Sequence, residues 1–170
     1  MISEKSIKKD KAILFINGTG GHKAQMVRLL HKLDIKNEIN GMKLVAICEK
    51  GAVLKEFDEY YEVIPMRDKH SYLKTFITAP LLIFKISYLI FKLLKGNNIE
   101  VLISTGPGIV TFPAIIFKVL NKKIIFIETW SRYETQSFSG RVMSKLADEF
   151  YVQNRSLLNK YSNAIYSGRL

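Results

Sequence analysis

Short apolar runs recur along the chain, and a segment with helical spacing of its hydrophobic residues follows most of them. The predicted strands are Ala12–Ile16, Leu44–Ile47, Val63–Ile64, Val101–Ser104, Ile124–Ile127 and Phe150–Val152. The predicted helices are His22–Leu33, Tyr72–Lys95, Pro113–Leu120 and Ser139–Ala147. Uniformly apolar strands that alternate with helices are typical of a parallel sheet covered on both faces. The pattern therefore predicts an α/β chain: a single Rossmann-like domain over residues 1–170, with a mostly parallel sheet and a polar N-terminal extension at 1–11.

Three polar or glycine-rich segments come directly after predicted strands. They are Asn17–His22, Ser104–Gly108 and Glu128–Arg132. In an open parallel sheet, ligands bind in the crevice outside the carboxyl ends of the strands. The three segments are therefore expected to meet at one edge and to form the functional site.

The first two segments supply the candidates for binding a phosphate group. Glycines let backbone N–H groups approach a ligand closely, and the start of a helix favours an anion. The first segment is not a Walker loop, because no Gly-Lys-Ser/Thr follows it, and it fits the dinucleotide fingerprint poorly, because Lys23 stands where the third glycine belongs. A tight turn or an ordinary strand-to-helix loop without a ligand is the alternative for each segment. The candidates are Asn17, Gly18, Thr19, Gly20, Gly21, Ser104, Thr105, Gly106 and Gly108.

Two side chains at this edge are candidates for the general base. His22 opens the first helix, and a neutral imidazole is suited to accepting a proton near neutral pH. Glu128 ends a buried strand, where an unpaired carboxylate is costly unless it is used. The alternatives are a histidine that only caps its turn and a glutamate ion-paired with Arg132 or a lysine. No spacing of the three histidines and Cys48 predicts a metal site, and one cysteine excludes an internal disulfide framework.

The segment Tyr72–Lys95 predicts a long amphipathic helix with four lysines and no acidic residue. Its longest uncharged run, Thr75–Phe84, is too short to span a bilayer. One interpretation is a membrane-docking helix whose lysines reach anionic headgroups, and the other is a core helix with a thin solvated stripe. The candidate membrane residues are Lys74, Phe76, Leu81, Leu82, Phe84, Lys85, Tyr88, Leu89, Phe91 and Lys92.

The charge balance favours an anionic partner. Lys and Arg number 26 against 15 acidic residues, which gives a net charge of +11. The lysines are dispersed and no nucleic-acid-binding motif is present, so we expect an anionic membrane surface and no nucleic acid. The N-terminus is polar and lysine-rich, so we expect neither a signal peptide nor an N-terminal anchor.

The ordered set of segments resembles a known family. The glycine loop that ends in His22 resembles the N-terminal loop of MurG-type glycosyltransferases. The remaining motifs resemble PssD-type polysaccharide-biosynthesis proteins, a family that includes the membrane-anchoring subunit of the eukaryotic N-acetylglucosaminyltransferase that builds dolichol-linked chitobiose. These motifs are Ser104–Gly108, Ile127-Glu128, Arg132, Gly140, Tyr151-Val152-Gln153 and Ala164–Arg169. The resemblance covers the chain from about Ala12 to its end.

The resemblance implies one half of a GT-B glycosyltransferase, namely the N-terminal half that meets the acceptor and the membrane. A PssE-type partner would bind the UDP-sugar, so no cofactor is expected on this chain. The acceptor would be a polyprenyl-pyrophosphate-linked sugar at the cytoplasmic face of the cell membrane, where the chain binds peripherally or monotopically. His22 is the first candidate for the base and Glu128 the second. Arg132 or the N–H groups of Gly20 and Gly21 would hold the pyrophosphate.

The implied activity is that of one subunit of a heteromeric hexosyltransferase, inactive alone, in exopolysaccharide or capsule biosynthesis. Two other functions stay open at this point. The chain could be a standalone nucleotide-binding domain, or a membrane scaffold without catalytic residues whose partner performs the reaction.

Overall fold

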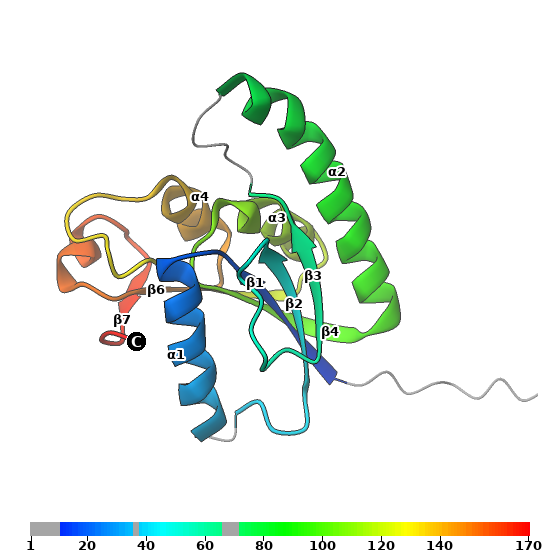
Figure 1. Ribbon diagram of the computed structural model, residues 1–170. Helices are drawn as coiled ribbons and strands as arrows, with labels where there is room; N and C mark the ends of the chain where they lie inside the picture. Colours follow the sequence, from blue (N-terminus) through cyan, green and yellow to red (C-terminus); the bar gives the residue numbers. More distant parts are fainter. Residues whose placement is uncertain (1–10, 36–37, 66–71) are drawn as a thin grey trace, which may run out of the picture.

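A computed structural model describes residues 11–35, 38–65 and 72–170, and the side chains within this part except those of residues 35 and 72–79. The strands are β1 (Lys11–Asn17), β2 (Lys43–Glu49), β3 (Glu59–Val63), β4 (Asn98–Ser104), β5 (Lys123–Ile127), β6 (Glu149–Val152) and β7 (Ala164–Tyr166). The helices are α1 (Gly21–Ile35), α2 (Tyr72–Gly96), α3 (Thr111–Val119) and α4 (Phe138–Leu146), with short 3-10 helices η1 (Gly108–Val110) and η2 (Arg155–Asn159) (Figure 1).

The strands form one seven-stranded sheet in the order β3-β2-β1-β4-β5-β6-β7. All strand pairings in the described part of the chain are parallel, which confirms the predicted α/β class. The chain adds strands on one side of β1 and then on the other. The order therefore changes direction between β1 and β4, and the carboxyl ends of these two strands are the place where open parallel sheets usually bind ligands.

The two outermost strands differ from the sequence prediction. The predicted third strand, Val63–Ile64, overlaps the observed β3 only at Val63, and β7 was not predicted as a strand. Both strands lie at sheet edges and are half exposed. They therefore lack the continuous apolar run by which the buried strands were recognised.

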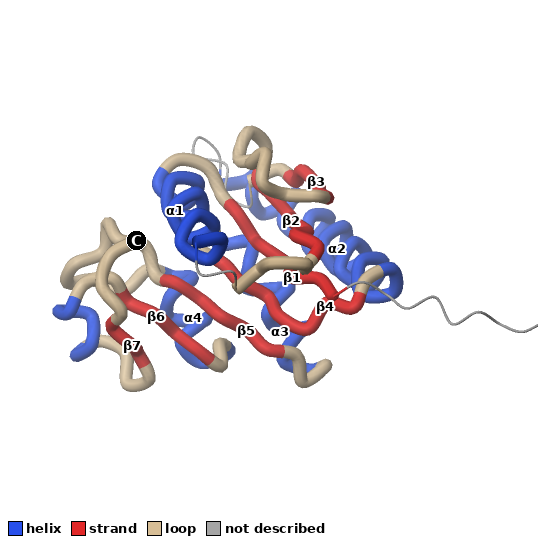
Figure 2. The backbone as a smooth tube through the Cα atoms, turned by 90° about the horizontal axis from the view of Figure 1, so that it is seen from below, coloured by secondary structure: helices blue, strands red, loops and turns tan. Residues whose placement is uncertain are grey.

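The sheet lies between two helical layers, because successive residues of its strands point to opposite faces. Leu14 and Ile16 of β1 face the core under α2, α3 and α4, whereas Ile13 and Phe15 face the core under α1. Figure 2 shows α1 in front of the sheet and α3 and α4 behind it. The layers bury both faces and leave the carboxyl edge of the strands to carry the polar loops.

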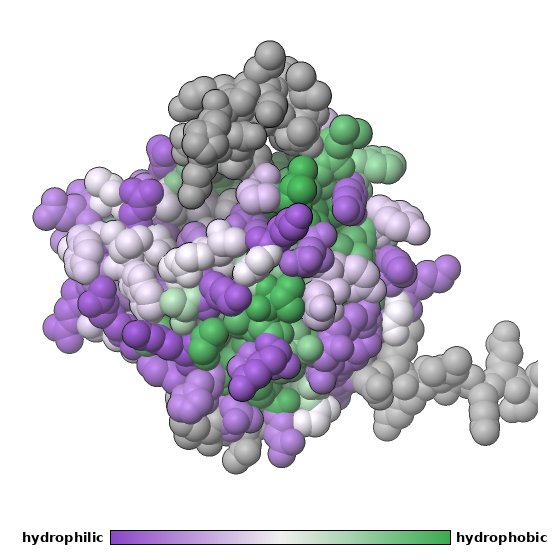
Figure 3. Space-filling model, viewed as in Figure 1, coloured by the Kyte–Doolittle hydropathy of each residue, from purple (hydrophilic) through white to green (hydrophobic). Residues whose placement is uncertain are grey.

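Helix α2 has two apolar sides with different environments. Leu82, Ile86 and Leu93 are buried against the sheet, whereas Leu81, Phe84, Tyr88 and Phe91 are exposed, with Phe84 reaching 79%. Hydrophobic surface gathers over this helix in Figure 3. The sequence prediction was wrong for two membrane candidates, Leu82 and Leu89, which are only 4% and 7% exposed and belong to the core.

The remaining membrane candidates fall into two groups. Leu81, Phe84, Lys85, Tyr88, Phe91 and Lys92 are exposed. Lys74 and Phe76 lie in the first two turns of α2, where the side chains are outside the described part. Among the residues that the structure describes, no helix has both the length and the apolar character needed to cross a bilayer.

Candidate functional site

The loops after β1 and β4 touch at the point where the strand order changes direction. Gly18 lies so close to the second loop that a Cβ added to it would be 2.7 Å from the Cβ of Pro107. Gly106 has a φ of +113°, a backbone conformation open mainly to glycine. Only glycines at these two positions allow the loops to pack together, so the prediction that these segments meet is confirmed.

His22 is held by the backbone of the second loop. Its Nδ1 lies 2.7 Å from the carbonyl oxygen of Thr105, and the Thr105 hydroxyl donates a hydrogen bond to the carbonyl of His22 at 3.0 Å. The ring packs on Gly106, where an added Cβ would lie 2.9 Å from His22 Cε1. These contacts fix both the position and the plane of the imidazole.

The same contacts determine which ring nitrogen of His22 is basic. A carbonyl oxygen only accepts hydrogen bonds, so Nδ1 carries the proton in the neutral imidazole. Nε2 then has the free lone pair, and the half-buried ring keeps part of its surface open to solvent. A histidine oriented by a carbonyl bond at one nitrogen is arranged to accept a proton at the other.

Three predicted phosphate-binding residues shape the loops instead of facing a ligand. Asn17, Ser104 and Thr105 are fully buried. Asn17 donates to the carbonyl of Ala52 at 2.6 Å, and Ser104 donates to the carbonyl of Ile16 at 3.0 Å. The Asn17 Nδ2 group and the hydroxyls of Ser104 and Thr105 tie β1 and β4 to neighbouring backbone, whereas the buried Asn17 Oδ1 has no partner in the described part of the chain.

The first loop keeps an exposed backbone at Thr19, Gly20 and Gly21. The N–H of Thr19 donates to the Glu49 carboxylate at 3.2 Å, so this group already has an anionic partner. Gly20 has a φ of +63°, which turns the chain into α1. Trp130 stands beside the start of α1, with its Nε1 3.8 Å from the place a Cβ of Gly21 would occupy.

Glu128 is buried and takes its hydrogen bonds from within the chain. Its side chain is 1% exposed and accepts from Thr129 N at 2.9 Å, the Ser137 hydroxyl at 2.9 Å and the Tyr161 hydroxyl at 2.7 Å. No Lys, Arg or His of the described part lies within ion-pair distance, so the alternative of an ion pair with Arg132 or a lysine is not found there. Arg132 instead donates to Thr135.

A chain of contacts joins the Glu128 cluster to the His22 loop. Ser137 caps α4 by accepting from Gly140 N at 2.7 Å, and Ser139 donates to the carbonyl of Gly106 at 3.0 Å. The sequence reasoning missed Ser137, Ser139 and Tyr161. A serine before a helix is a recognisable cap signal and would have identified Ser137. Tyr161 lies 33 residues from Glu128 and gives no local signal.

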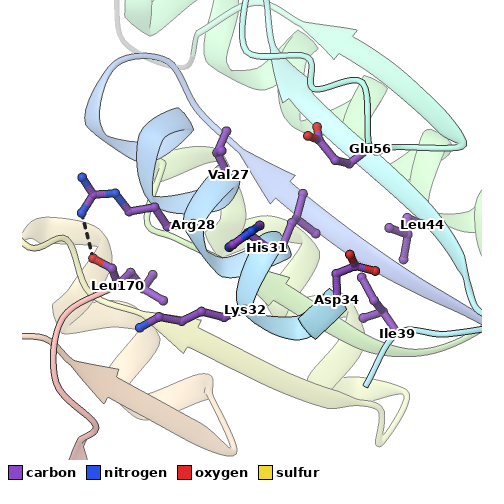
Figure 4. A pocket seen from close by; sticks show the side chains of 10 residues that line it. Val27, Arg28, His31, Lys32, Asp34, Ile39, Leu44, Glu56 and Leu170 are labelled. Atoms are coloured by element: carbon purple, nitrogen blue, oxygen red, sulfur yellow. Dashed lines mark hydrogen bonds between the residues drawn. The ribbon is translucent and has the colours of Figure 1, made fainter. Parts of the chain in front are cut away.

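A cavity of about 630 Å³ lies away from this site. Its lining includes His31 and Asp34 from the second half of α1, together with Leu44 at the start of β2 (Figure 4). It therefore lies toward the amino ends of the strands, opposite the edge that carries His22. Arg28 and the last residue, Leu170, close one side through a hydrogen bond of 3.0 Å.

The described residues contain no group of three or more His, Cys, Asp or Glu side chains placed to share a metal ion. Cys48 is fully buried in β2, and burial raises the pKa of its thiol to about 12. Such a thiol is a poor nucleophile.

Comparison with known proteins identifies relatives along nearly the whole chain. The family model described as "Oligosaccharide biosynthesis protein Alg14 like" matches residues 13–170. UDP-N-acetylglucosamine transferase subunit ALG14 of Candida albicans is 28% identical and aligns with 97% of this chain and 83% of its own length. The human protein of the same name is 27% identical over 94% of this chain and 82% of its own length.

Solved structures share the fold. The Acinetobacter baumannii MurG structure superposes with a TM-score of 0.69 at 13% identity, covering 94% of this chain. A UDP-glucose: anthocyanidin 3-O-glucosyltransferase in complex with UDP superposes with a TM-score of 0.58 at 11% identity, covering 95% of this chain. The chain spans about half of each, 46% and 53% respectively, so these likenesses confirm a MurG-like fold for one half of such a molecule.

Proposed function

The chain belongs to the Alg14-like family of oligosaccharide biosynthesis proteins, and from this premise we propose that it is the acceptor-binding subunit of a two-chain glycosyltransferase. A separate donor-binding chain of PssE type holds a UDP-sugar. UDP-N-acetylglucosamine is the first donor to test, because the relatives are named as subunits of its transferase. The acceptor is a polyprenyl-pyrophosphate-linked sugar.

The observation that carries this proposal is the size of the chain relative to its structural neighbours. It spans 46% of MurG at a TM-score of 0.69, while its sequence relatives are named as subunits and align over 75% or more of their own length. The chain has the fold of one half of MurG, and its relatives are named as subunits. Both observations support the proposal that a second chain completes the cleft. His22 stands at the edge where that cleft would open.

The proposed reaction is a direct displacement. An acceptor hydroxyl attacks the anomeric carbon of the UDP-sugar, and a new C–O bond forms as the bond to UDP breaks. Nε2 of His22 takes the hydroxyl proton, and UDP leaves with the bonding electron pair. The Thr105 carbonyl stabilises the resulting imidazolium through the Nδ1–H bond. Glu128, 1% exposed and fully hydrogen-bonded, holds the site together instead of acting as the base.

The acceptor pyrophosphate is proposed to bind at the start of α1. Backbone N–H groups of Gly20 and Gly21 are exposed there, and the positive end of the helix dipole favours an anion. Arg132, half-buried on the neighbouring loop, adds a positive charge. The N–H of Thr19 does not take part, because Glu49 occupies it.

Membrane binding is proposed to be peripheral, at the cytoplasmic face, through the outer side of α2. Exposed Leu81, Phe84 and Phe91 enter the headgroup region, while Lys85 and Lys92 meet anionic lipids. Because the opposite side of the helix packs in the core, α2 can serve as a dock without leaving the fold. Exopolysaccharide or capsule biosynthesis is the proposed setting.

Reconstitution from two chains tests the proposed function. The chain is purified alone and with a donor-binding partner, and each sample receives vesicles that contain a polyprenyl-pyrophosphate-linked sugar and UDP-N-acetylglucosamine. We expect an extended lipid-linked product only when both chains are present. Product from this chain alone would overturn the two-chain proposal, and so would full activity of the partner without it. Binding of UDP by the isolated chain would instead support a standalone nucleotide-binding domain.

A further inference from the structure

A groove of about 410 Å³ runs between α3 and α4, on the side of the sheet that also carries α2. Its volume lies within the range of about 300–1,000 Å³ that is usual for small-molecule sites. It is an open groove in the surface and is separate from the cavity beside α1. Its lining consists of Ile115, Phe138, Arg141, Val142, Lys145 and Leu146.

The lining combines apolar side chains with two cations. Neither the α3 nor the α4 sequence contains an acidic residue, so no carboxylate of these helices competes for the groove. Arg141 and Lys145 are both exposed and stand one helical turn apart on α4. Phe138 leaves 70% of its surface in solvent, a large exposure for an aromatic side chain beside a cavity. This chemistry fits an amphiphile that has a phosphate group directly joined to a hydrocarbon chain.

One lining residue of the groove, Phe138, is connected to the His22 site through its two sequence neighbours. Phe138 stands between Ser137, which binds Glu128, and Ser139, which donates to the Gly106 carbonyl at 3.0 Å. Gly106 in turn supports the His22 ring. From Phe138 the groove follows α4 away from the carboxyl edge past Arg141 and Lys145 to Leu146. A ligand whose sugar reaches His22 would therefore extend its lipid part along α4.

We propose that the α3–α4 groove binds the first isoprenoid units of the lipid-linked acceptor and the lipid-side phosphate of its pyrophosphate, while the sugar-side phosphate binds at the start of α1; this rests on the proposed function. Arg141 and Lys145 pair with the phosphate that is joined to the lipid, and Ile115, Val142 and Leu146 contact the hydrocarbon chain. The cavity beside α1 does not suit this ligand, because Asp34 and Glu56 line it and it lies at the other end of the strands. In this proposal the exposed side of α2 binds the membrane surface in general, and the groove binds one specific lipid, the acceptor.

A binding experiment in detergent separates this site from general adsorption to membranes. The two-chain complex is titrated with geranylgeranyl pyrophosphate by calorimetry, and with geranylgeraniol as the uncharged probe. For Arg141→Gln/Lys145→Gln we expect the affinity for the pyrophosphate to fall about tenfold or more, because two charge-assisted contacts are lost. The matched control is Lys118→Gln/Lys122→Gln, which removes the same charge with the same spacing outside the groove. It should bind as the wild type does.

A second variant, Phe138→Ser, tests the apolar part of the groove. The side chain is mostly exposed, so the fold should tolerate the change, and binding of both probes should weaken. Equal affinity of the wild type and the groove variants would overturn the proposal, and so would no binding of the pyrophosphate to the wild-type complex. Equal affinity for geranylgeraniol and the pyrophosphate would overturn the role of the two cations. Absence of transfer activity in the wild-type complex would count against the proposed function alone, because binding is measured without turnover.

Discussion

The carboxyl ends of β1 and β5 both carry a polar side chain suited to proton transfer, yet the two positions differ in what covers them. The His22 ring, after β1, lies against the backbone of Thr105 and Gly106, and its second nitrogen has no hydrogen-bond partner in the described part of the chain. Glu128, after β5, lies beneath the start of α4 and Tyr161. Position at the carboxyl edge of the sheet therefore identifies candidate catalytic residues. The packing around each residue then decides whether it is suited to catalysis or to a structural role.

The largest effect is expected when the imidazole of His22, the proposed base, is removed. With His22→Ala, kcat of the two-chain enzyme should fall by about 10²–10⁴, the usual contribution of a general base. Because the ring is only half-buried, the free energy of unfolding should change by no more than about 1 kcal/mol. Steady-state kinetics and urea denaturation measure the two effects. Turnover close to that of the wild type would remove His22 from the role of base.

The next largest effect is expected at Gly140, which closes the Glu128 cluster. A Cβ at this position would overlap Glu128 Oε2 and the Tyr161 hydroxyl and would lie 2.8 Å from Ser137 Oγ. Gly140→Ala should therefore destabilise the fold by about 3 kcal/mol, as overpacking of a rigid buried site does. Gly96→Ala at the end of α2 is the control, because its Cβ meets nothing within 4 Å. Equal midpoints of urea denaturation for the two variants would mean that the side chains around Gly140 can move aside at little cost in stability.

A third change separates support from catalysis at Glu128 itself. Glu128→Gln keeps the shape but turns one acceptor oxygen into a donor that faces the Ser137 or Tyr161 hydroxyl. The unmatched donors should cost about 1–3 kcal/mol of stability. At a temperature where the variant is folded, kcat should stay within about tenfold of the wild type, well above the value for His22→Ala. A large loss of kcat at unchanged stability would instead make Glu128 the base.

The difference between the two regions also shows how far sequence reasoning reaches. The apolar runs predicted β1, β4 and β5, and the position of the polar segments directly after parallel strands predicted that the first two loops meet. Both predictions depend only on local composition and on the geometry of parallel sheets. Neither requires knowledge of contacts between residues that are distant in sequence. The role of His22 stays a prediction until its kinetics are measured.

Two features of the structure could not be predicted from the sequence, and each has a physical reason. Helix α2 is apolar on two sides, so its periodicity could not show that Leu82 and Leu89 face the core while Phe84 faces solvent. The partners of Glu128 lie 9 and 33 residues away, at Ser137 and Tyr161, and only the folded chain brings them together. Because the hydroxyls that hydrogen-bond to the buried Glu128 are distant in sequence, no local spacing of residues predicts these contacts.

The smallest predicted effect isolates one hydroxyl of the Glu128 cluster. Tyr161 is 3% exposed and donates to Glu128 at 2.7 Å, so Tyr161→Phe should cost about 1 kcal/mol near pH 8. Burial and the neighbouring Glu128 carboxylate raise the pKa of Tyr161 above its ordinary value. Above pH ~10 the unfolded chain therefore releases this proton more readily than the folded chain, and stability falls as the pH rises. Tyr161→Phe removes this slope, so its deficit relative to the wild type should shrink between pH 8 and pH ~10.5. A constant deficit in urea denaturation across that range would show that folding does not raise the pKa of Tyr161.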